Sequence, residues 1–375
     1  AVASGKDAYA FGDMAQASGE FSYAFGNDAI ASGFKSTAIG DSATALGEGS
    51  YAIGYEVTAS GNFSLAMGDR STASSLYSTA MGHQTTASGF SSNAMGYNTT
   101  ASGTSSNAMG DSTTASGAYS NAMGRITTAS GFSSNAMGYN TTASGTSSNA
   151  MGDSTTASGN YSTAMGRITT AIGTASTAMG YSTTASGNYS TAMGYSTTAS
   201  GFASTAMGYN TTASGFASTA VGTSTAAIGT GSTATGSYTT APSFAEMAIG
   251  QYNTTYTPAS STSWSSVDRL LVIGNGQSSA PSDAMIVYKD GSTIINGALT
   301  LSNGANSITL PNTDGTSGQI LTTDGSGNVS FQNAPSFFNN MQGGTAAVGS
   351  SGGANFKEVT ITFPTPFSTT PTIVG

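Results

Sequence analysis

His83 is the only histidine of this 375-residue sequence and therefore the first candidate for acid–base chemistry. It stands in the segment MGHQTT, where a nucleophilic triad would need a serine and an aspartate to converge on it. The sequence offers only generic serines there, of the kind found throughout the chain. We therefore expect a solvated residue at a corner of the backbone and no triad.

The carboxylates are too sparse to suggest a pair for glycoside hydrolysis, since Asp and Glu together number 17. Asp283 and Asp290 are close in sequence, but a hairpin turn accounts for Asp290. No zinc or calcium ligand spacing is present, cysteine is absent, and IGNGQ lacks the lysine and the helix of a phosphate loop. The sequence predicts a non-catalytic protein without a cofactor or a metal.

Side chains that could contact a ligand occur instead at variable positions of a repeat. One series combines aromatic rings with charges, and such residues suit binding to sugars or proteins. The alternative is that they stack along the molecule and cover its backbone. The candidate ligand contacts are Tyr97, Tyr139, Tyr181, Tyr195, Tyr209, Arg125, Arg167, Asp111 and Asp153, and a second series contains Phe90, Phe132, Phe202 and Phe216.

The composition limits the classes of partner. Charged residues make up 7% of the sequence, the net charge is −9, and Lys and Arg number only 8. Because nucleic-acid binding needs clustered cations, we expect no nucleic-acid partner. No apolar run is long enough to cross a bilayer, so we expect no membrane insertion of this segment. Such a composition is typical of a disordered chain or of a stack of short repeats.

The repeat itself has fourteen residues, with the consensus A-S-G-x-x-S-x-A-M-G-x-x-T-T. Seventeen units run without an insertion from Ala3 to Thr240, and a degenerate eighteenth begins at Ala241. Two glycines per unit disfavour a helix by roughly 2 kcal/mol, which excludes a coiled coil. We predict an all-β fold, a parallel β-solenoid in which each half-unit is a short strand and G-x-x forms the corner with glycine at positive φ.

Alternation along the strands assigns the faces. Alanine, glycine, serine and the first threonine of each pair share one face, which we expect to be a thin interior. The other face carries a column of large apolar residues, which lies outside the chain and predicts an obligate homo-oligomer. The alternative is that this column fills a wider core within one chain. The predicted subunit interface comprises Phe11, Phe25, Ile39, Ile53, Met67, Met81, Met95, Met109, Met123, Met137, Met151, Met165, Met179, Met193, Met207 and Val221.

Two short segments carry a family resemblance: SSNAMG at 91–96 and STAIG at 36–40. They resemble the repeats of trimeric autotransporter adhesins, the YadA-like head, and the resemblance extends from residue 3 to about 250. It implies a left-handed β-roll of fourteen-residue coils and three chains around a shared axis. It also implies adhesion to a surface and an extracellular location, but no particular ligand.

The remaining sequence predicts further β structure. We expect a β-rich neck over 251–334, with one strand in 268–276 and three more in 284–301, separated by Asp-Gly and Asn-Gly turns. The segment GTSGQILTTDGSGNVSF resembles the neck and shaft of tail fibres, which implies an intertwined trimeric neck. Residues 335–355 predict a Gly-rich linker. Residues 356–375 resemble the start of an H-type lectin-like tip domain, which we expect to be truncated.

The leading hypothesis is therefore a homotrimeric adhesin or receptor-binding fibre that projects from a bacterial surface or a phage tail. Its expected partners are its own copies and a glycan or protein of a host or cell surface. Two other hypotheses remain open. One is an ice-binding solenoid that uses regular threonine rows, and the other is a tailspike that cleaves polysaccharide with residues contributed across subunits.

Overall fold

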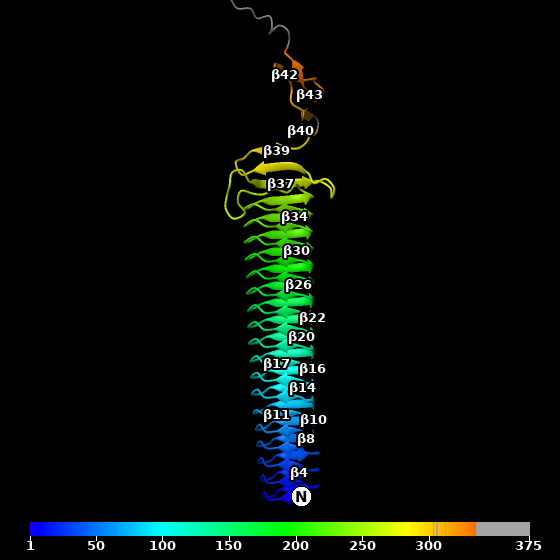
Figure 1. Cartoon of the computed structure of the whole chain (residues 1–375), viewed down its shortest axis with the longest axis vertical. Helices are drawn as coiled ribbons and strands as arrows, with labels where there is room; N and C mark the ends of the chain where they lie inside the picture. Colours follow the sequence, from blue (N-terminus) through cyan, green and yellow to red (C-terminus); the bar gives the residue numbers. More distant parts are fainter. Residues whose placement is uncertain (303, 305–306, 312, 335–375) are drawn as a thin grey trace, which may run out of the picture. The chain divides into compact units, whose positions relative to one another are not determined.

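A computed structural model describes residues 1–302, 304, 307–311 and 313–334 of the chain. The chain divides into two compact units, residues 1–295 and 296–375, which are described separately. All elements among the described residues of both units are β-strands (Figure 1). The predicted linker at 335–355 and the predicted tip domain at 356–375 lie outside the described residues.

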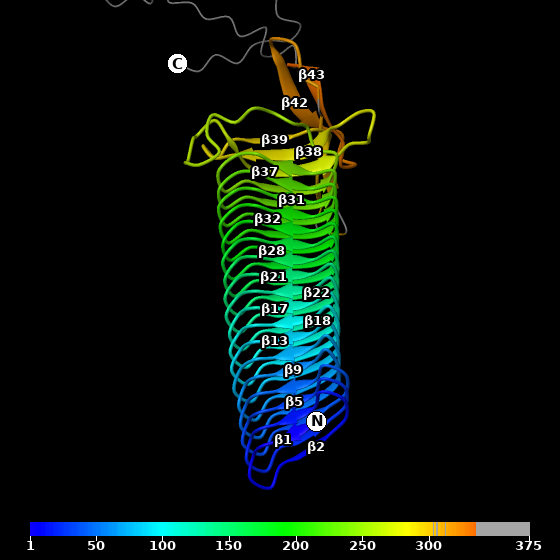
Figure 2. The same cartoon turned by 60° about the horizontal axis from the view of Figure 1, so that its bottom comes forward.

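The first unit is a stack of flattened coils with two strands per coil (Figure 2). The odd-numbered strands have two residues each and recur every fourteen residues from β1 (Val2–Ala3) to β35 (Thr240–Ala241). The even-numbered strands β2 (Tyr9–Phe11), β4 (Tyr23–Phe25) and β6 (Thr37–Ile39) have three residues. From β8 (Tyr51–Tyr55) to β36 (Met247–Gln251) they have five and recur with the same period. The fourteen-residue parallel β-solenoid predicted from the sequence is confirmed.

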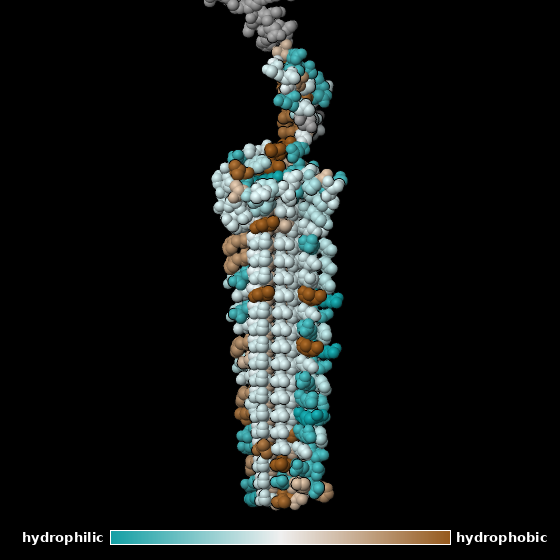
Figure 3. Space-filling view, in the orientation of Figure 1, coloured by the Kyte–Doolittle hydropathy of each residue, from teal (hydrophilic) through white to brown (hydrophobic). Residues whose placement is uncertain are grey.

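Each strand pairs in parallel with its own copy in the next coil, without a shift of register. In the long-strand sheet, formed by the even-numbered strands, Met95 of β14 (Asn93–Tyr97) pairs with Met109 of β16 (Asn107–Asp111). In the short-strand sheet, formed by the odd-numbered strands, Ala101 pairs with Ala115. Because the register never slips, identical repeat positions form straight columns along the solenoid, which are visible on its surface (Figure 3).

The interior of the coils is as thin as the alternation predicts. Numbered from Ala87 as position 1, the alanines at positions 1 and 8 are fully buried, as are the serine at position 6 and the first threonine at position 13. Met95 at position 9 lies on the opposite, outer face of its strand and is half-buried. The alternative in which the methionines fill the core of one chain is therefore wrong, because alanine occupies that core.

The prediction of glycine at positive φ in the corners is confirmed at position 10 of the repeat and is wrong at position 3. The left-handed conformation belongs to the residue two places after each glycine, such as Ser91 and Asn98, both at φ 51°. The glycine at position 3 has no positive φ and is required for a different reason. A Cβ on Gly89 would lie 2.0 Å from the carbonyl oxygen of Gly103 in the next coil. At position 10, Gly96 combines φ +128° with the same close approach to Gly110.

The last coil is followed by three strands that continue the long-strand sheet: β37 (Arg269–Asn275), β38 (Asp283–Tyr288) and β39 (Thr293–Ile295). β37 pairs with β36 in parallel, and its residue Val272 takes the place of the core alanine Ala248. β38 and β39 then add antiparallel. These strands were predicted from the sequence, but their continuation of the solenoid sheet was not.

The described part of the second unit contains two antiparallel hairpins. β40 (Leu299–Ser302) pairs with β41 (Ser307–Leu310), and β42 (Gln319–Thr323) pairs with β43 (Val329–Asn333). The Asp-Gly-Ser-Gly-Asn turn between β42 and β43 is stabilised by Asp324, whose Oδ1 accepts hydrogen bonds from the backbone N–H groups of Ser326 and Asn328. The strands expected for this region are therefore present, and the turn between β42 and β43 follows the expected pattern.

Candidate functional surfaces

The outer face of the long-strand sheet presents three columns, formed by repeat positions 7, 9 and 11. The methionine column at position 9 contains the sixteen residues predicted as a subunit interface. Its members pair with one another in register, as in the series Met123, Met137 and Met151. Phe11, Phe25 and Ile39 are exposed, and the remaining members are half-buried. The structure thus brings these side chains together on one face of the chain.

The apolar column also extends beyond the residues found by sequence reasoning. Thr235 interrupts it after Val221, and Ile249 then restores it. Ile273 lies beside Ile249, Met285 beside Ile273 and Ile295 beside Met285. The segment MAIGQ at 247–251 could have revealed the first of these, because it retains the A-x-G alternation of the repeat. The other three could not be aligned because the fourteen-residue period ends.

An asparagine ladder occupies position 7 beside the methionine column, and sequence reasoning missed it. In this ladder the side-chain amide of each of the first four asparagines donates to the amide oxygen of the asparagine in the next coil at 2.8–3.0 Å. The five rungs are Asn93, Asn107, Asn121, Asn135 and Asn149. The fourteen-residue spacing of asparagines was the signal that could have revealed it.

Position 11 contains all nine residues predicted as ligand contacts, and it lies at the end of each long strand. Many of these residues contact one another. Arg125 is 3.5 Å from Asp111 through its Nε atom and lies over the ring of Tyr139 at 5.6 Å. Tyr195 stacks between Tyr181 and Tyr209, with ring centroids 4.8 and 5.1 Å away. Stacking along the solenoid is therefore present, and ligand contact by these residues remains a prediction.

His83 belongs to the same column and is more constrained than expected. It is the last residue of β12 (Thr79–His83), and its Nδ1 atom is 2.9 Å from Asp69 Oδ2. Its ring stacks on Tyr97 at 5.0 Å. The hydrogen bond from Arg70, followed by that from His83, lowers the pKa of Asp69. The expectation of a merely solvated corner residue is corrected by these contacts, and no serine takes part in them.

A second aromatic series lies at the other corner, where Phe90, Phe132, Phe202 and Phe216 were noted in the sequence. Each ring contacts the aromatic ring of a neighbouring coil. Phe132 packs edge-on against Tyr119 at 5.5 Å, and Phe202 stacks on Phe216 at 5.2 Å. These rings therefore pack against one another along the solenoid, as the alternative interpretation proposed.

The end of the solenoid is closed by a buried polar cluster that the sequence did not reveal. Glu246 replaces the serine of position 6, is 1% exposed, and accepts a hydrogen bond from the Ser243 N–H at 2.9 Å. Burial raises the pKa of Glu246, while its hydrogen bonds from Ser243 oppose this shift. Lys289 donates to Ser243 Oγ at 2.9 Å, and burial lowers the pKa of Lys289.

Other charged residues at this end of the solenoid, here called the end cap together with the buried cluster, hold the loop between β36 and β37 in place. Asp268 accepts hydrogen bonds from the backbone N–H groups of Ala259 and Ser260 at 2.7 and 3.0 Å. Arg269 donates to the Thr254 carbonyl at 2.8 Å and lies 3.4 Å from Asp283 Oδ2. Asp290 accepts the Ser292 N–H within its turn, as predicted from the sequence.

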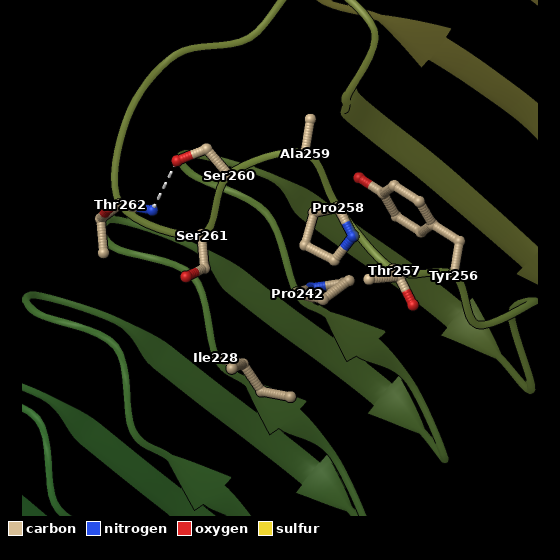
Figure 4. A pocket seen from close by; sticks show the side chains of 9 residues that line it. All are labelled: Ile228, Pro242, Tyr256, Thr257, Pro258, Ala259, Ser260, Ser261 and Thr262. Atoms are coloured by element: carbon tan, nitrogen blue, oxygen red, sulfur yellow. Dashed lines mark hydrogen bonds between the residues drawn. The ribbon is translucent and has the colours of Figure 1, made fainter.

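The same loop borders a shallow pocket on the outer face of the short-strand sheet. Its floor contains Ile228 and Pro242, and its rim is formed by residues 256–262 (Figure 4). Within the described residues, no group of three or more His, Cys, Asp or Glu could hold a metal ion. The described part of the chain also has no helix long and apolar enough to cross a membrane.

The repeats match a known family once they are compared with other proteins. The family described as YadA head domain repeat (two copies) matches residues 3–29, 31–56, 59–85, 87–106, 129–148, 143–167, 171–197, 199–225 and 220–241. A comparison with curated proteins finds no match. The matched segments lie within the coils from β1 to β35, with residues 107–128 unmatched, and they cover more than half of the chain. The chain therefore belongs to the family of YadA head domain repeats, which in this protein form a parallel β-solenoid of about 18 turns.

Proposed function

We propose that this chain is the head and neck of a homotrimeric attachment fibre. Adhesin heads of the YadA family are surface-exposed on bacteria and non-catalytic, and the family is trimeric. The proposal extends these properties to this chain, with a left-handed β-roll in each of three subunits. Its partners would be its own copies and a glycan or protein of a host or cell surface, reached from a bacterial surface or a phage tail.

The observation that carries the proposal is the half-buried methionine column on the outer face of the long-strand sheet. Most of these side chains have only about a quarter of their surface left exposed, and burying that part is worth roughly 0.5 kcal/mol each. Sixteen side chains then contribute roughly 8 kcal/mol per subunit, which is of the same order as an association cost of about 4–15 kcal/mol. A continuous apolar stripe of this length favours an obligate assembly over an exposed surface.

Sedimentation equilibrium at submicromolar concentration tests the assembly. We expect a mass of three chains of 36.9 kDa each. The double variant Met137→Lys, Met151→Lys should sediment as a monomer, because two adjacent charges would enter the apolar interface. The matched control Ser144→Lys, Ser158→Lys places the same charges on exposed positions directly after the short strands β21 (Thr142–Ala143) and β23 (Thr156–Ala157) of adjacent coils. A monomeric wild type, or dissociation of the control alone, would contradict the proposal.

Attachment is tested separately from assembly. Fluorescent beads coated with the trimer are passed over arrays of immobilised glycans and proteins, and beads coated with the monomeric methionine variant serve as the control. We expect retention of the trimer-coated beads on at least one array. If trimeric protein confers no retention on either array, attachment through this segment is wrong even though the assembly is right.

A further inference from the structure

Ile126 and Ile168 have a backbone conformation that disfavours their side chains. Both lie at position 12 with φ 55°, in the left-handed region. They are the only β-branched residues at positive φ in the described part of the chain. A β-branched side chain is a conformational outlier there, whereas asparagine tolerates this region. The neighbouring coils indeed have Asn140 and Ser154 at the same corner.

The two isoleucines are also exposed, by 45% and 46%. Their side chains therefore receive little burial within this chain that could offset the backbone strain. Strained residues of this kind concentrate at functional sites, and the inference runs from the observed outlier to a function. Nothing in the solenoid requires isoleucine at this corner, so a contact outside the chain is the better explanation.

An exposed cation stands beside each isoleucine. Arg125 and Arg167 are the only Lys or Arg residues between positions 71 and 268. Their side chains are 64% and 62% exposed, and each makes its ion pair through Nε. No Nη atom of either arginine has a hydrogen-bond partner among the described residues. These donors are therefore available to an external carboxylate, which arginine recognises in bidentate geometry.

The same arrangement occurs twice. The Ser112 hydroxyl donates to Asp111, which pairs with Arg125. In the second copy the Ser154 hydroxyl donates to Asp153, which pairs with Arg167 at 3.4 Å. Arg167 lies over Tyr181 at 5.6 Å, as Arg125 lies over Tyr139. Three coils separate the copies, which at the strand spacing of about 4.8 Å corresponds to roughly 14 Å.

We propose that these two Ile–Arg units form a bivalent docking site for a protein ligand. Each unit binds an aliphatic side chain through isoleucine and a neighbouring carboxylate through arginine, and the ligand presents this pair twice, about 14 Å apart. The proposal rests on the attachment function proposed above and names the class of ligand for one part of the fibre. A peptide supplies both groups from adjacent residues, whereas a glycan carboxylate offers no aliphatic side chain to cover the isoleucine.

The test uses fluorescently labelled synthetic peptides and the trimeric protein, with binding measured by fluorescence polarisation. The two-pair probe is Leu-Glu-Ser-Gly-Ser-Leu-Glu, whose leucines can reach about 17 Å apart when extended. One control peptide lacks the second Leu-Glu pair. A second control replaces both glutamates with lysine, and a third replaces both leucines with serine. We expect the two-pair probe to bind at least about tenfold more tightly than each control, because the second contact becomes intramolecular.

The double variant Ile126→Asn, Ile168→Asn should reduce affinity for the two-pair probe at least tenfold, while the protein remains trimeric and unfolds at the same or a higher temperature. The matched control Ile172→Ser, Ile228→Ser removes two isoleucines that directly follow short strands and are 52% and 44% exposed, and it should bind the two-pair probe as the wild type does.

Three outcomes would overturn the docking site. One is a two-pair probe that binds no better than its controls, and another is a variant that binds it unchanged. The third is a variant with a lower trimer mass or melting temperature, which would place the isoleucines inside the subunit interface. Binding of 3′-sialyllactose that depends on Arg125 but not on Ile126 would instead indicate a glycan carboxylate. A monomeric wild type would refute the fibre proposal itself, whatever the peptides do.

Discussion

Ile249 of β36 lies directly beside Ile273 of β37 in parallel register, although the chain leaves the solenoid between them. The same register places Val272 beside Ala248 and Gly274 beside Gly250. The strand after the loop therefore occupies the position of a further coil, and its core residue is larger than those before it. A larger side chain is possible there because β38 turns back antiparallel and no further coil follows.

The first prediction concerns Val272, which is fully buried at this end of the solenoid. Val272→Ala should lower the free energy of unfolding by about 2–3 kcal/mol, because it removes buried methyl groups and leaves a cavity. Urea denaturation followed by circular dichroism measures the change. Val267→Ala is the control, since Val267 is 65% exposed and its loss should change stability by less than about 0.5 kcal/mol. Equal effects of the two variants would show that β37 does not seal the core.

The second prediction concerns the contact between glycines of successive coils. A Cβ on Gly138 would lie 2.0 Å from the carbonyl oxygen of Gly152, at φ +127°. Gly138→Ala should therefore force the coils apart and destabilise the solenoid by about 4 kcal/mol or more. At Gly231, φ is +66° and a Cβ would meet only the Ala245 Cα at 4.0 Å. Gly231→Ala should lower the free energy of unfolding by only about 1–2 kcal/mol, through backbone strain.

Thermal unfolding of both glycine variants by calorimetry provides the comparison. A Gly138→Ala protein as stable as Gly231→Ala would contradict the close stacking of the coils at position 10.

The third prediction concerns the asparagine ladder. Asn121 accepts a hydrogen bond from Asn107 and donates one to Asn135, whereas Asn93 at the end of the ladder only donates to Asn107. Asn121→Ala should therefore destabilise the protein by about 1–2 kcal/mol, and Asn93→Ala by about half as much. Both variants truncate a half-buried asparagine of the same column, so the difference between their urea midpoints reports the number of ladder hydrogen bonds lost. No difference would mean that the ladder bonds contribute nothing to stability.

The fourth prediction concerns the pH dependence of the end cap. Burial raises the pKa of Glu246, so the folded protein binds this proton more tightly than the unfolded chain does. Stability must then fall as the pH rises through the window between the ordinary and the raised pKa of Glu246. Arg269 and Lys289 face the same carboxylate and limit the rise, and Tyr256 donates to it at 3.4 Å.

Glu246→Gln removes that titration and keeps the shape of the side chain. Melting temperatures of the wild type and the variant should converge at acidic pH, and the variant should become relatively more stable as the pH increases. Glu48→Gln, at an exposed corner of the fourth coil, is the control. Its melting temperature should change with pH as that of the wild type does. If the melting temperature of Glu246→Gln follows the same pH dependence as that of the wild type, the buried carboxylate of Glu246 does not destabilise the folded protein when it ionises.

The sequence alone determined the repeating part of this protein. Alternation places Ala94 inside and Met95 outside, and two glycines per unit exclude a helix. With an unbroken period of fourteen residues, the neighbours of every side chain in the next coil follow as well, so the methionine column could be predicted residue by residue. These features depend on local geometry and on repetition, both of which are visible in a single unit.

Only the tertiary structure decided what happens where repetition ends or where a unit departs from its consensus. The loop at 252–268 hides the register of β37, so the continuation of the apolar column through Ile273 was not predictable. Glu246 is buried because residues far along the chain, including Lys289, close over it. The strain at Ile126 depends on a backbone conformation two residues beyond the expected glycine. Where two segments do not share a repeat period, neither sequence shows which residues of the other segment it will contact. Such contacts are known only from the folded structure.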